Sequence, residues 1–237
     1  MAVCCPTDLT AAASDYKSVG TVEKVGELDV YFTGQGKAGV VVFSDIFGDH
    51  NNTRRVCDRL ADAGMLVAMP DYFRGKPWPA EKFPPPDRDE FMAWIGTFPW
   101  EQINKETQPV VSLLKARGVE KIGCVGFCWG GKMIAHMAAD PQISAVATAH
   151  PSFWTHELLQ GVKCPMCALP SKDEADDETL GKSVLAAGPC GKDLVWQRFD
   201  DMHHGWVSAR EYNTEENRKR AAEAISIFID FFKKHLM

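Results

Sequence analysis

A cysteine flanked by glycines is the residue of this chain best suited to act as a nucleophile. Cys128 lies in the run Gly-Phe-Cys-Trp-Gly-Gly over residues 126–131, which follows a short apolar stretch and precedes a helix-like stretch over 132–139. A nucleophile between a strand and a helix occupies a strained turn. The residues two before and two after it must therefore be small, as Gly126 and Gly130 are. The pattern predicts a nucleophile elbow with cysteine in the place of serine, rather than a buried structural cysteine.

A thiol nucleophile needs a base, and the base needs an acid that orients it. Asp173 is the next acid beyond a predicted strand after Cys128, and the pair His203 and His204 follows the last predicted strand. We predict that His204 is the base, because the glycine after it permits a sharp turn. Asp173 begins an acidic run in which Asp176 is the alternative acid, and the same run could instead be a solvated helix cap.

Attack on a carbonyl carbon creates an oxyanion, which two main-chain N–H groups stabilise in sites of this kind. We expect one donor to be Trp129, the residue after the nucleophile, and the other to be Ile46, in the loop after a predicted central strand. Asp45 adjoins Ile46 and adds an acid at the mouth of the site. The alternative role for such an acid is a helix or turn cap.

The composition indicates a globular chain and excludes several classes of partner. The 237 residues include 45% hydrophobic ones, and the net charge of -6 provides no basic footprint for nucleic acid or an anionic membrane. No apolar run approaches the roughly 20 residues of a membrane span, and the first residues lack a secretory pattern. We therefore expect a cytoplasmic protein, a monomer without an obligate partner, although a larger assembly is possible.

The eight cysteines do not suggest a disulfide scaffold in a chain of this length. Cys164 and Cys167 have the spacing of a redox or zinc half-site, but no second half-site follows at a suitable distance. The pair also begins a strand-like run, which favours ordinary core cysteines. We expect neither a metal nor a cofactor.

Apolar segments alternate with helix-like ones along most of the chain. The strand candidates are residues 19–24, 28–32, 39–44, 65–69, 121–125, 143–147, 166–169 and 194–199. The main helix candidates are residues 51–63, 88–95, 101–117, 132–139, a segment near 177–187, and 215–234. This alternation predicts a mostly parallel doubly wound sheet in one domain over 18–237, after a loosely held arm over 1–17. Ligands of such sheets bind beyond the carboxyl ends of the strands, where the residues named above fall.

Taken together, these residues resemble the dienelactone hydrolase family, also called carboxymethylenebutenolidases, in its eukaryotic branch. The segments that resemble the family are residues 45–48, 52–54, 69–73, 126–131 and 204–205. The resemblance implies an α/β-hydrolase fold and a triad of Cys128, His204 and Asp173. It further implies hydrolysis of small lactones or esters, including carboxylate-bearing ones, through an acyl-enzyme.

The resemblance also suggests roles for residues around the triad. Asp45 would help to activate the thiol, where bacterial members have glutamate. Arg74 is a candidate for binding a substrate carboxylate. Trp78 and the segment His150-Pro151-Ser152, which follows a strand end, are candidate pocket walls, with surface packing as the alternative for each.

Two other functions are compatible with the sequence. The fold could serve as a binding or structural component of a larger assembly with little or no turnover. A thiol redox protein using Cys128, or the pair Cys164 and Cys167, is the third hypothesis.

Overall fold

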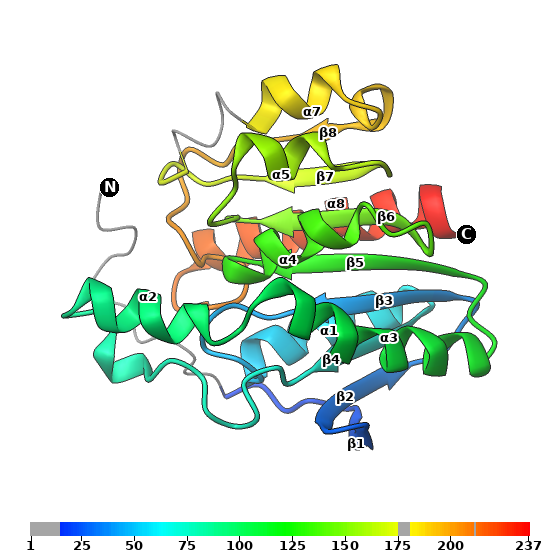
Figure 1. Cartoon of the computed structure of the whole chain (residues 1–237), viewed down its shortest axis with the longest axis horizontal. Coiled ribbons are helices and arrows are strands. Elements are labelled where there is room, and N and C mark those ends of the chain that lie inside the picture. The colour runs from blue at the N-terminus through cyan, green and yellow to red at the C-terminus, as the bar shows by residue number, and fades with distance from the viewer. Residues whose placement is uncertain (1–14, 175–180, 211) are drawn as a thin grey trace.

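A computed structural model describes residues 15–174, 181–210 and 212–237. Within these residues an eight-stranded sheet has the order β1-β2-β4-β3-β5-β6-β7-β8 (Figure 1). The strands are β1 (Thr21–Val25), β2 (Leu28–Gly34), β3 (Ala38–Phe43), β4 (Met65–Pro70), β5 (Lys121–Phe127), β6 (Ile143–Ala149), β7 (Met166–Leu169) and β8 (Val195–Trp196). In the described sheet the pairings from β4 through β3 to β8 are all parallel, whereas β2 pairs antiparallel with both β1 and β4 at one edge. The prediction of a mostly parallel sheet is confirmed.

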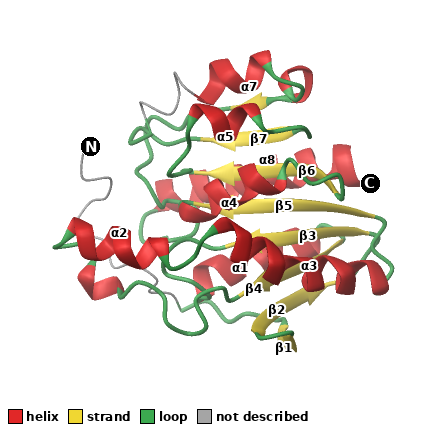
Figure 2. Cartoon of the chain, in the orientation of Figure 1, coloured by secondary structure: helices red, strands yellow, loops and turns green. Residues whose placement is uncertain are grey.

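Helices cover both faces of the sheet (Figure 2). The helices are α1 (Asn51–Asp62), α2 (Arg88–Gly96), α3 (Trp100–Ala116), α4 (Trp129–Met137), α5 (His156–Gln160), α7 (Ser183–Ala187) and α8 (Glu215–Leu236), with 3-10 turns η1 (Ala80–Lys82) and η3 (Gly191–Asp193). One apolar core joins α1 and α8 to one face of the sheet. A second core joins α3, α4, α5 and α7 to the other face.

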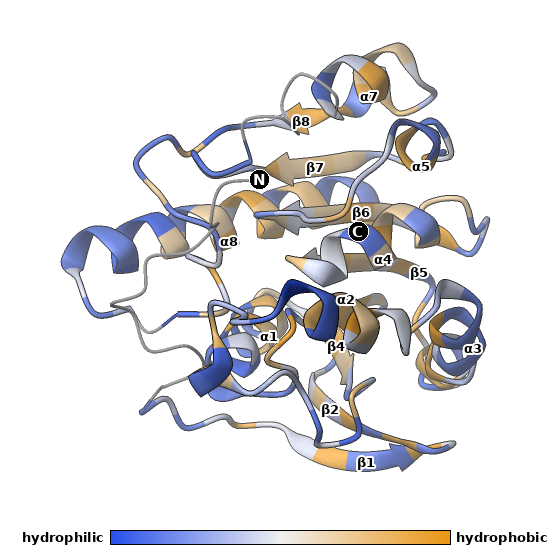
Figure 3. Ribbon diagram, turned by 60° about the vertical axis from the view of Figure 1, so that its left-hand side comes forward, coloured by the Kyte–Doolittle hydropathy of each residue, from blue (hydrophilic) through white to orange (hydrophobic). Residues whose placement is uncertain are grey.

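Burial explains why these segments adopt their structures. Every residue of β3 is buried, as expected of a β-branched strand that helices cover on both faces. Ala224, Phe228 and Phe232 recur at helical spacing on the buried side of α8. In Figure 3 the first turns of α8 are hydrophilic and the later turns, which lie on the sheet, are more apolar.

The structure differs from the predicted elements in the region between β7 and α8. The predicted strand over 194–199 shortens to β8, because it lies at the edge of the sheet and has only β7 as a neighbour. The helix expected near 177–187 falls partly on residues 175–180, outside the described residues, and α7 covers its last part. Most of the predicted arm also lies outside them, but Tyr16 donates a hydrogen bond to the buried Asp58 on α1 (2.9 Å).

The two closely spaced cysteines are buried thiols, as expected of core residues. Cys164 and Cys167 are both free and buried, and Cys167 lies in β7. Burial raises the pKa of Cys164 to about 12, which opposes thiolate chemistry there. Among the described residues, no helix has both the length and the apolar character needed to span a bilayer.

Candidate active site

The turn between β5 and α4 has the strained geometry of a nucleophile elbow. Cys128 has φ 53° and ψ -114°, a backbone conformation that residues other than glycine rarely adopt. A Cβ atom on Gly126 would lie 2.2 Å from the carbonyl oxygen of Gly130. A Cβ atom on Gly130 would lie 2.2 Å from the carbonyl oxygen of Phe43 in β3. Both glycines are therefore required by the close approach of backbone atoms, and Cys128 is partly exposed at the carboxyl end of β5.

His204 and not His203 faces the cysteine. The His204 imidazole is within hydrogen-bonding reach of the Cys128 thiol and is almost fully buried. The His203 ring donates through Nδ1 to the carbonyl oxygen of His204 (2.8 Å). Gly205 has φ 85°, the left-handed conformation that the predicted sharp turn requires.

The carboxylate at the His204 ring belongs to Glu174, whereas the sequence favoured its neighbour Asp173. Glu174 Oε1 lies 2.5 Å from His204 Nδ1, and Asp173 Oδ2 accepts the main-chain N–H of His204 (2.7 Å). A tight turn after β7 causes this arrangement. The Ser171 hydroxyl accepts the N–H of Asp173, and the Ser171 N–H donates to Glu174 Oε2, which directs the Glu174 side chain inward. The alternative acid, Asp176, lies outside the described residues.

The surroundings of His204 favour the imidazolium form. Burial by itself lowers the pKa of His204. The negative charge and hydrogen bond of Cys128, followed by those of Glu174, outweigh this effect and hold the pKa well above its ordinary value. This arrangement suits a thiolate–imidazolium pair.

The loop after β3 is held in place on both sides. The Ile46 carbonyl accepts the N–H of Trp78 (2.9 Å), and the Gly48 N–H donates to the Asp45 carbonyl (3.0 Å). Within the described part of the chain, the N–H of Ile46 donates no hydrogen bond. Trp129 is the first residue of α4, so its N–H has no carbonyl partner within the helix. Neither N–H group has a main-chain acceptor among the described residues, so both could donate to a ligand.

Asp45 is fully buried beside this loop. Its Oδ1 accepts the N–H of Phe47 (2.9 Å), its Oδ2 accepts the hydroxyl of Ser208 (2.6 Å), and His50 Nε2 lies 3.3 Å from Oδ1. Burial raises the pKa of Asp45, but His50 and the two other donors outweigh it and lower the pKa below its ordinary value. The carboxylate therefore links the loop after β3 to the loop that contains His204.

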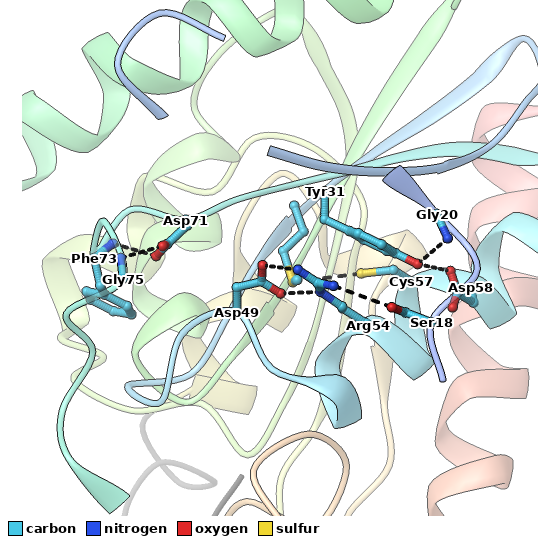
Figure 4. A network of polar contacts seen from close by, with 11 residues as sticks. Ser18, Gly20, Tyr31, Asp49, Arg54, Cys57, Asp58, Asp71, Phe73 and Gly75 are labelled. Carbon is cyan, nitrogen blue, oxygen red and sulfur yellow. Dashed lines mark hydrogen bonds and ion pairs between the residues drawn. The ribbon is translucent and has the colours of Figure 1, made fainter. Parts of the chain in front are cut away.

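Further aspartates fix the loops after β3 and β4 (Figure 4). Arg54 of α1 forms a bidentate pair with Asp49, with both distances at 2.6 Å. Asp71 accepts the N–H groups of Phe73 (3.1 Å) and Gly75 (2.6 Å). These contacts position the turn that contains Arg74, which has φ 53°.

The structure gives Arg74 and Trp78 partners within the fold. The Arg74 guanidinium pairs with Glu106 of α3 and donates to the carbonyl of Tyr72 (3.1 Å). The Trp78 indole is buried and packs edge-on against the rings of Phe91 and Trp94 in α2, with centroids 5.0 and 5.5 Å apart. The main chain of Trp78 thus supports Ile46, while its side chain anchors α2 over the loops.

His150 lies beside the candidate base. Its fully buried ring packs edge-on against that of His204, with the centroids 5.0 Å apart. Neither ring nitrogen has a hydrogen-bond partner among the described residues. Burial, with the charges of His204 and His203, lowers the pKa of His150 well below its ordinary value, which favours the neutral ring.

Three residues that the sequence did not single out lie at this site, Glu174, Ser208 and Arg210, and a fourth, Ser152, was predicted only as part of a pocket wall. Glu174 was detectable only as a member of the acidic run, and Ser208 had no motif around it. Arg210 is a buried cation on the loop after His204. The described residues contain no cluster of three or more His, Cys, Asp or Glu side chains that could hold a metal ion.

The chain is similar to known proteins in both sequence and fold. Residues 28–236 match the sequence model of the dienelactone hydrolase family. An AIM2 family protein of Schizosaccharomyces pombe is 34% identical, with 98% of this chain and 99% of the relative covered. The carboxymethylenebutenolidase homolog of Homo sapiens is also 34% identical, with 98% and 97% covered. The crystal structure of a Klebsiella pneumoniae protein assigned as a dienelactone hydrolase gives a TM-score of 0.74 at 19% identity, with 92% and 99% covered, a likeness of fold.

Proposed function

The chain belongs to the dienelactone hydrolase family, and from this premise we propose that it hydrolyses small esters or lactones through an acyl-enzyme on Cys128. The observation that supports this proposal best is the chain of contacts from Cys128 through His204 to Glu174. A buried imidazole between a thiol and a carboxylate is an arrangement that activates a nucleophile. The strained elbow presents that thiol at the carboxyl edge of the sheet, where ligands bind in folds of this class.

The first half of the reaction forms a thioester. His204 takes the proton of the Cys128 thiol, and the thiolate attacks the carbonyl carbon of the substrate. The carbonyl oxygen becomes an oxyanion that accepts hydrogen bonds from the N–H groups of Ile46 and Trp129. As the carbon–oxygen single bond breaks, His204 returns its proton to the leaving alkoxide. In a lactone this alkoxide stays attached to the acyl group.

The second half releases the product. His204 takes a proton from a water molecule, which attacks the thioester and passes through a second oxyanion at the same N–H groups. The collapse of this intermediate frees the acid and restores the Cys128 sulfur, with the proton returned by His204. Glu174 orients the imidazole and stabilises its positive charge in both halves.

Asp45 has a positioning role in this proposal. The family resemblance suggested direct activation of the thiol, but the carboxylate binds Phe47, Ser208 and His50. These contacts support a role in holding the oxyanion loop against the histidine loop. The two roles make different predictions for Asp45 and Ser208 variants, which are considered in the Discussion.

The charge near the site supports substrates that bear a carboxylate. Arg210 is 2% exposed, and its guanidinium lies over the ring of Phe83, 5.5 Å from the centroid. Burial lowers the pKa of the nearby His203, and the charge of Arg210 adds to this effect. A cation next to the candidate base would attract a substrate carboxylate and orient its carbonyl group.

Intact-protein mass spectrometry tests the proposal. The protein is mixed with a small activated ester, and the mass is followed over time for the wild type and for Cys128→Ala. A transient acyl adduct on the wild type alone, together with hydrolysis, is the expected result. A folded protein that forms no adduct and hydrolyses none of a broad ester panel would overturn the proposal and favour a binding module.

A further inference from the structure

The segment after β6 reaches the nucleophile directly. Ser152 Oγ lies 3.7 Å from Cys128 Sγ, within the longer range of hydrogen bonds to sulfur. The N–H of Ser152 donates to the carbonyl oxygen of Cys128 (3.0 Å), so main chain and side chain of one serine both contact the nucleophilic residue. His150 and Phe153 on either side have φ 40° and 61°, which bends the segment toward the elbow.

Other contacts hold this segment without touching the sulfur. The Thr148 hydroxyl donates to the carbonyl of Gly126 (2.8 Å), and the Trp154 indole donates to the carbonyl of Gly131 (3.0 Å). These bonds lie on both sides of Ser152 in the sequence and on both sides of Cys128 in the elbow. The main chain that carries Ser152 is therefore held against the elbow by bonds other than the contact of the serine with sulfur.

The chemistry of the pair decides the direction of the hydrogen bond. Within the described residues, the Ser152 hydroxyl has Cys128 Sγ as its only hydrogen-bond partner. A neutral thiol could donate to the hydroxyl, but a thiolate has no proton and can only accept. Once the proton has moved to His204, the Ser152 hydroxyl must therefore be the donor. Hydrogen bonds to charged groups are stronger than those between neutral groups.

We propose that the Ser152 hydroxyl donates a hydrogen bond to the Cys128 thiolate, and that Ser152 is a further catalytic residue. It stabilises the thiolate–imidazolium pair together with His204 and directs Sγ toward the substrate carbonyl. The inference deepens the proposed function, because it takes Cys128 as the nucleophile. It assigns the serine no bond-making step: the donated proton stays on Ser152.

Alkylation of Cys128 by iodoacetamide tests this inference without an ester substrate. Only the thiolate reacts, so the rate constant follows the thiolate population. Ser152→Ala keeps the main-chain N–H bond and removes only the hydroxyl. We expect alkylation of this variant near neutral pH to be about three- to tenfold slower than that of the wild type. This effect is smaller than a hydrogen bond to a charged group usually gives, because the Ser152 hydroxyl lies 3.7 Å from the sulfur. The two rate constants should converge at alkaline pH, above the ordinary thiol pKa of about 8.5.

Two further variants separate this role from packing. Thr148→Val removes a bond between the same segment and the same elbow but leaves the sulfur untouched, so its pH profile should follow the wild type. Ser152→Thr keeps a hydroxyl and should retain most of the wild-type rate. Cys128→Ala measures the background from the other cysteines, and intact mass spectrometry counts the adducts.

Several outcomes would overturn the inference. The first is a pH profile of alkylation for Ser152→Ala that overlays that of the wild type. The second is a decrease in the Ser152→Ala rate constant of equal size at every pH. The third is a shift of the profile in Thr148→Val as large as that in Ser152→Ala. Ester hydrolysis is measured in parallel on the same preparations. If alkylation responds as expected while no variant or wild type hydrolyses an ester, the thiolate contact stands and the proposed hydrolase function fails.

Discussion

The Nδ1 atom of His204 lies 2.5 Å from Oε1 of Glu174, and this contact orients the candidate base. The adjacent Asp173 accepts the main-chain N–H of the same histidine (2.7 Å). Neighbouring carboxylates therefore hold one histidine by different atoms, the ring nitrogen and the backbone nitrogen. This division gives the two acids separable effects on catalysis.

Glu174→Gln is expected to lower kcat/KM for an activated ester by about 100-fold or more, because an amide does not stabilise the imidazolium. Asp173→Asn, the matched control, should cost less than about tenfold, since it weakens a single hydrogen bond to the backbone. Steady-state kinetics of both variants test this. An equal or larger loss in Asp173→Asn would return the role of ring partner to Asp173.

Ser208→Ala and Asp45→Asn distinguish positioning from thiol activation. If Asp45 links the two loops, both variants should lower kcat/KM, by about tenfold for the loss of the buried Ser208 bond. Neither should slow the alkylation of Cys128 by iodoacetamide. If Asp45 activates the thiol directly, Asp45→Asn should slow alkylation markedly while Ser208→Ala leaves it unchanged.

His150 is expected to make the fold less stable in mild acid. Its folded pKa lies below its ordinary value of 6.5, first because of burial and then because of the charges of His204 and His203. Below pH 6.5 the unfolded chain binds a proton at His150 that the native state does not bind. The free energy of unfolding is therefore undiminished above this pH and declines as the pH falls toward the folded pKa. His150→Phe should flatten the dependence of Tm on pH below neutrality. The groups that face the ring are Phe127, His204, His203 and Arg210.

His156→Gln is the control for this measurement. His156 is an exposed histidine at the start of α5, and its replacement controls for the loss of one histidine away from the buried site. A His150→Phe protein with an unchanged acid slope would contradict the neutral, buried state of His150.

The elbow glycines should be intolerant of any side chain. Gly126→Ala places a Cβ atom 2.2 Å from a backbone oxygen, so we expect it to cost about 1–3 kcal/mol or more of unfolding free energy. Gly96→Ala is the matched control, because a Cβ atom there would meet nothing within 4 Å. Gly96 ends α2, and alanine there should be neutral or stabilise by up to about 1 kcal/mol. Urea unfolding of both variants measures the difference, and similar midpoints would contradict the steric argument.

Arg210 and Arg74 differ as candidates for binding a substrate carboxylate. Arg74 lies on the turn after β4 and pairs with Glu106, and Arg210 is buried on the loop that follows His204. Arg210→Met should raise KM by about tenfold or more for a carboxylate-bearing ester, as expected for loss of an interaction with a charged group. KM for the neutral analogue should change little. Arg74→Met should affect both esters alike, and a selective effect there instead would reverse the assignment.

Much of the fold follows from local patterns. The buried run of β3 and the helical spacing of α8 identified a core strand and a covering helix without tertiary information. The prediction overextended β8, because an apolar run does not reveal how many neighbours a strand has. The choice between His203 and His204 was also open to local reasoning, since Gly205 marks the turn that presents one of them.

The sequence by itself determined the class of sheet and pointed to the candidate nucleophile and the candidate base, because each depends on short-range rules. A strained turn requires glycines next to Cys128, and alternating strands and helices require parallel pairing. Only the tertiary structure decided that Glu174 meets the imidazole and that Ser152 meets the sulfur. These contacts join residues 30 and 24 positions apart, and ångström-scale displacements of a turn select one side chain over its neighbour. No local pattern encodes displacements of that size, since they result from how the loops pack on one another.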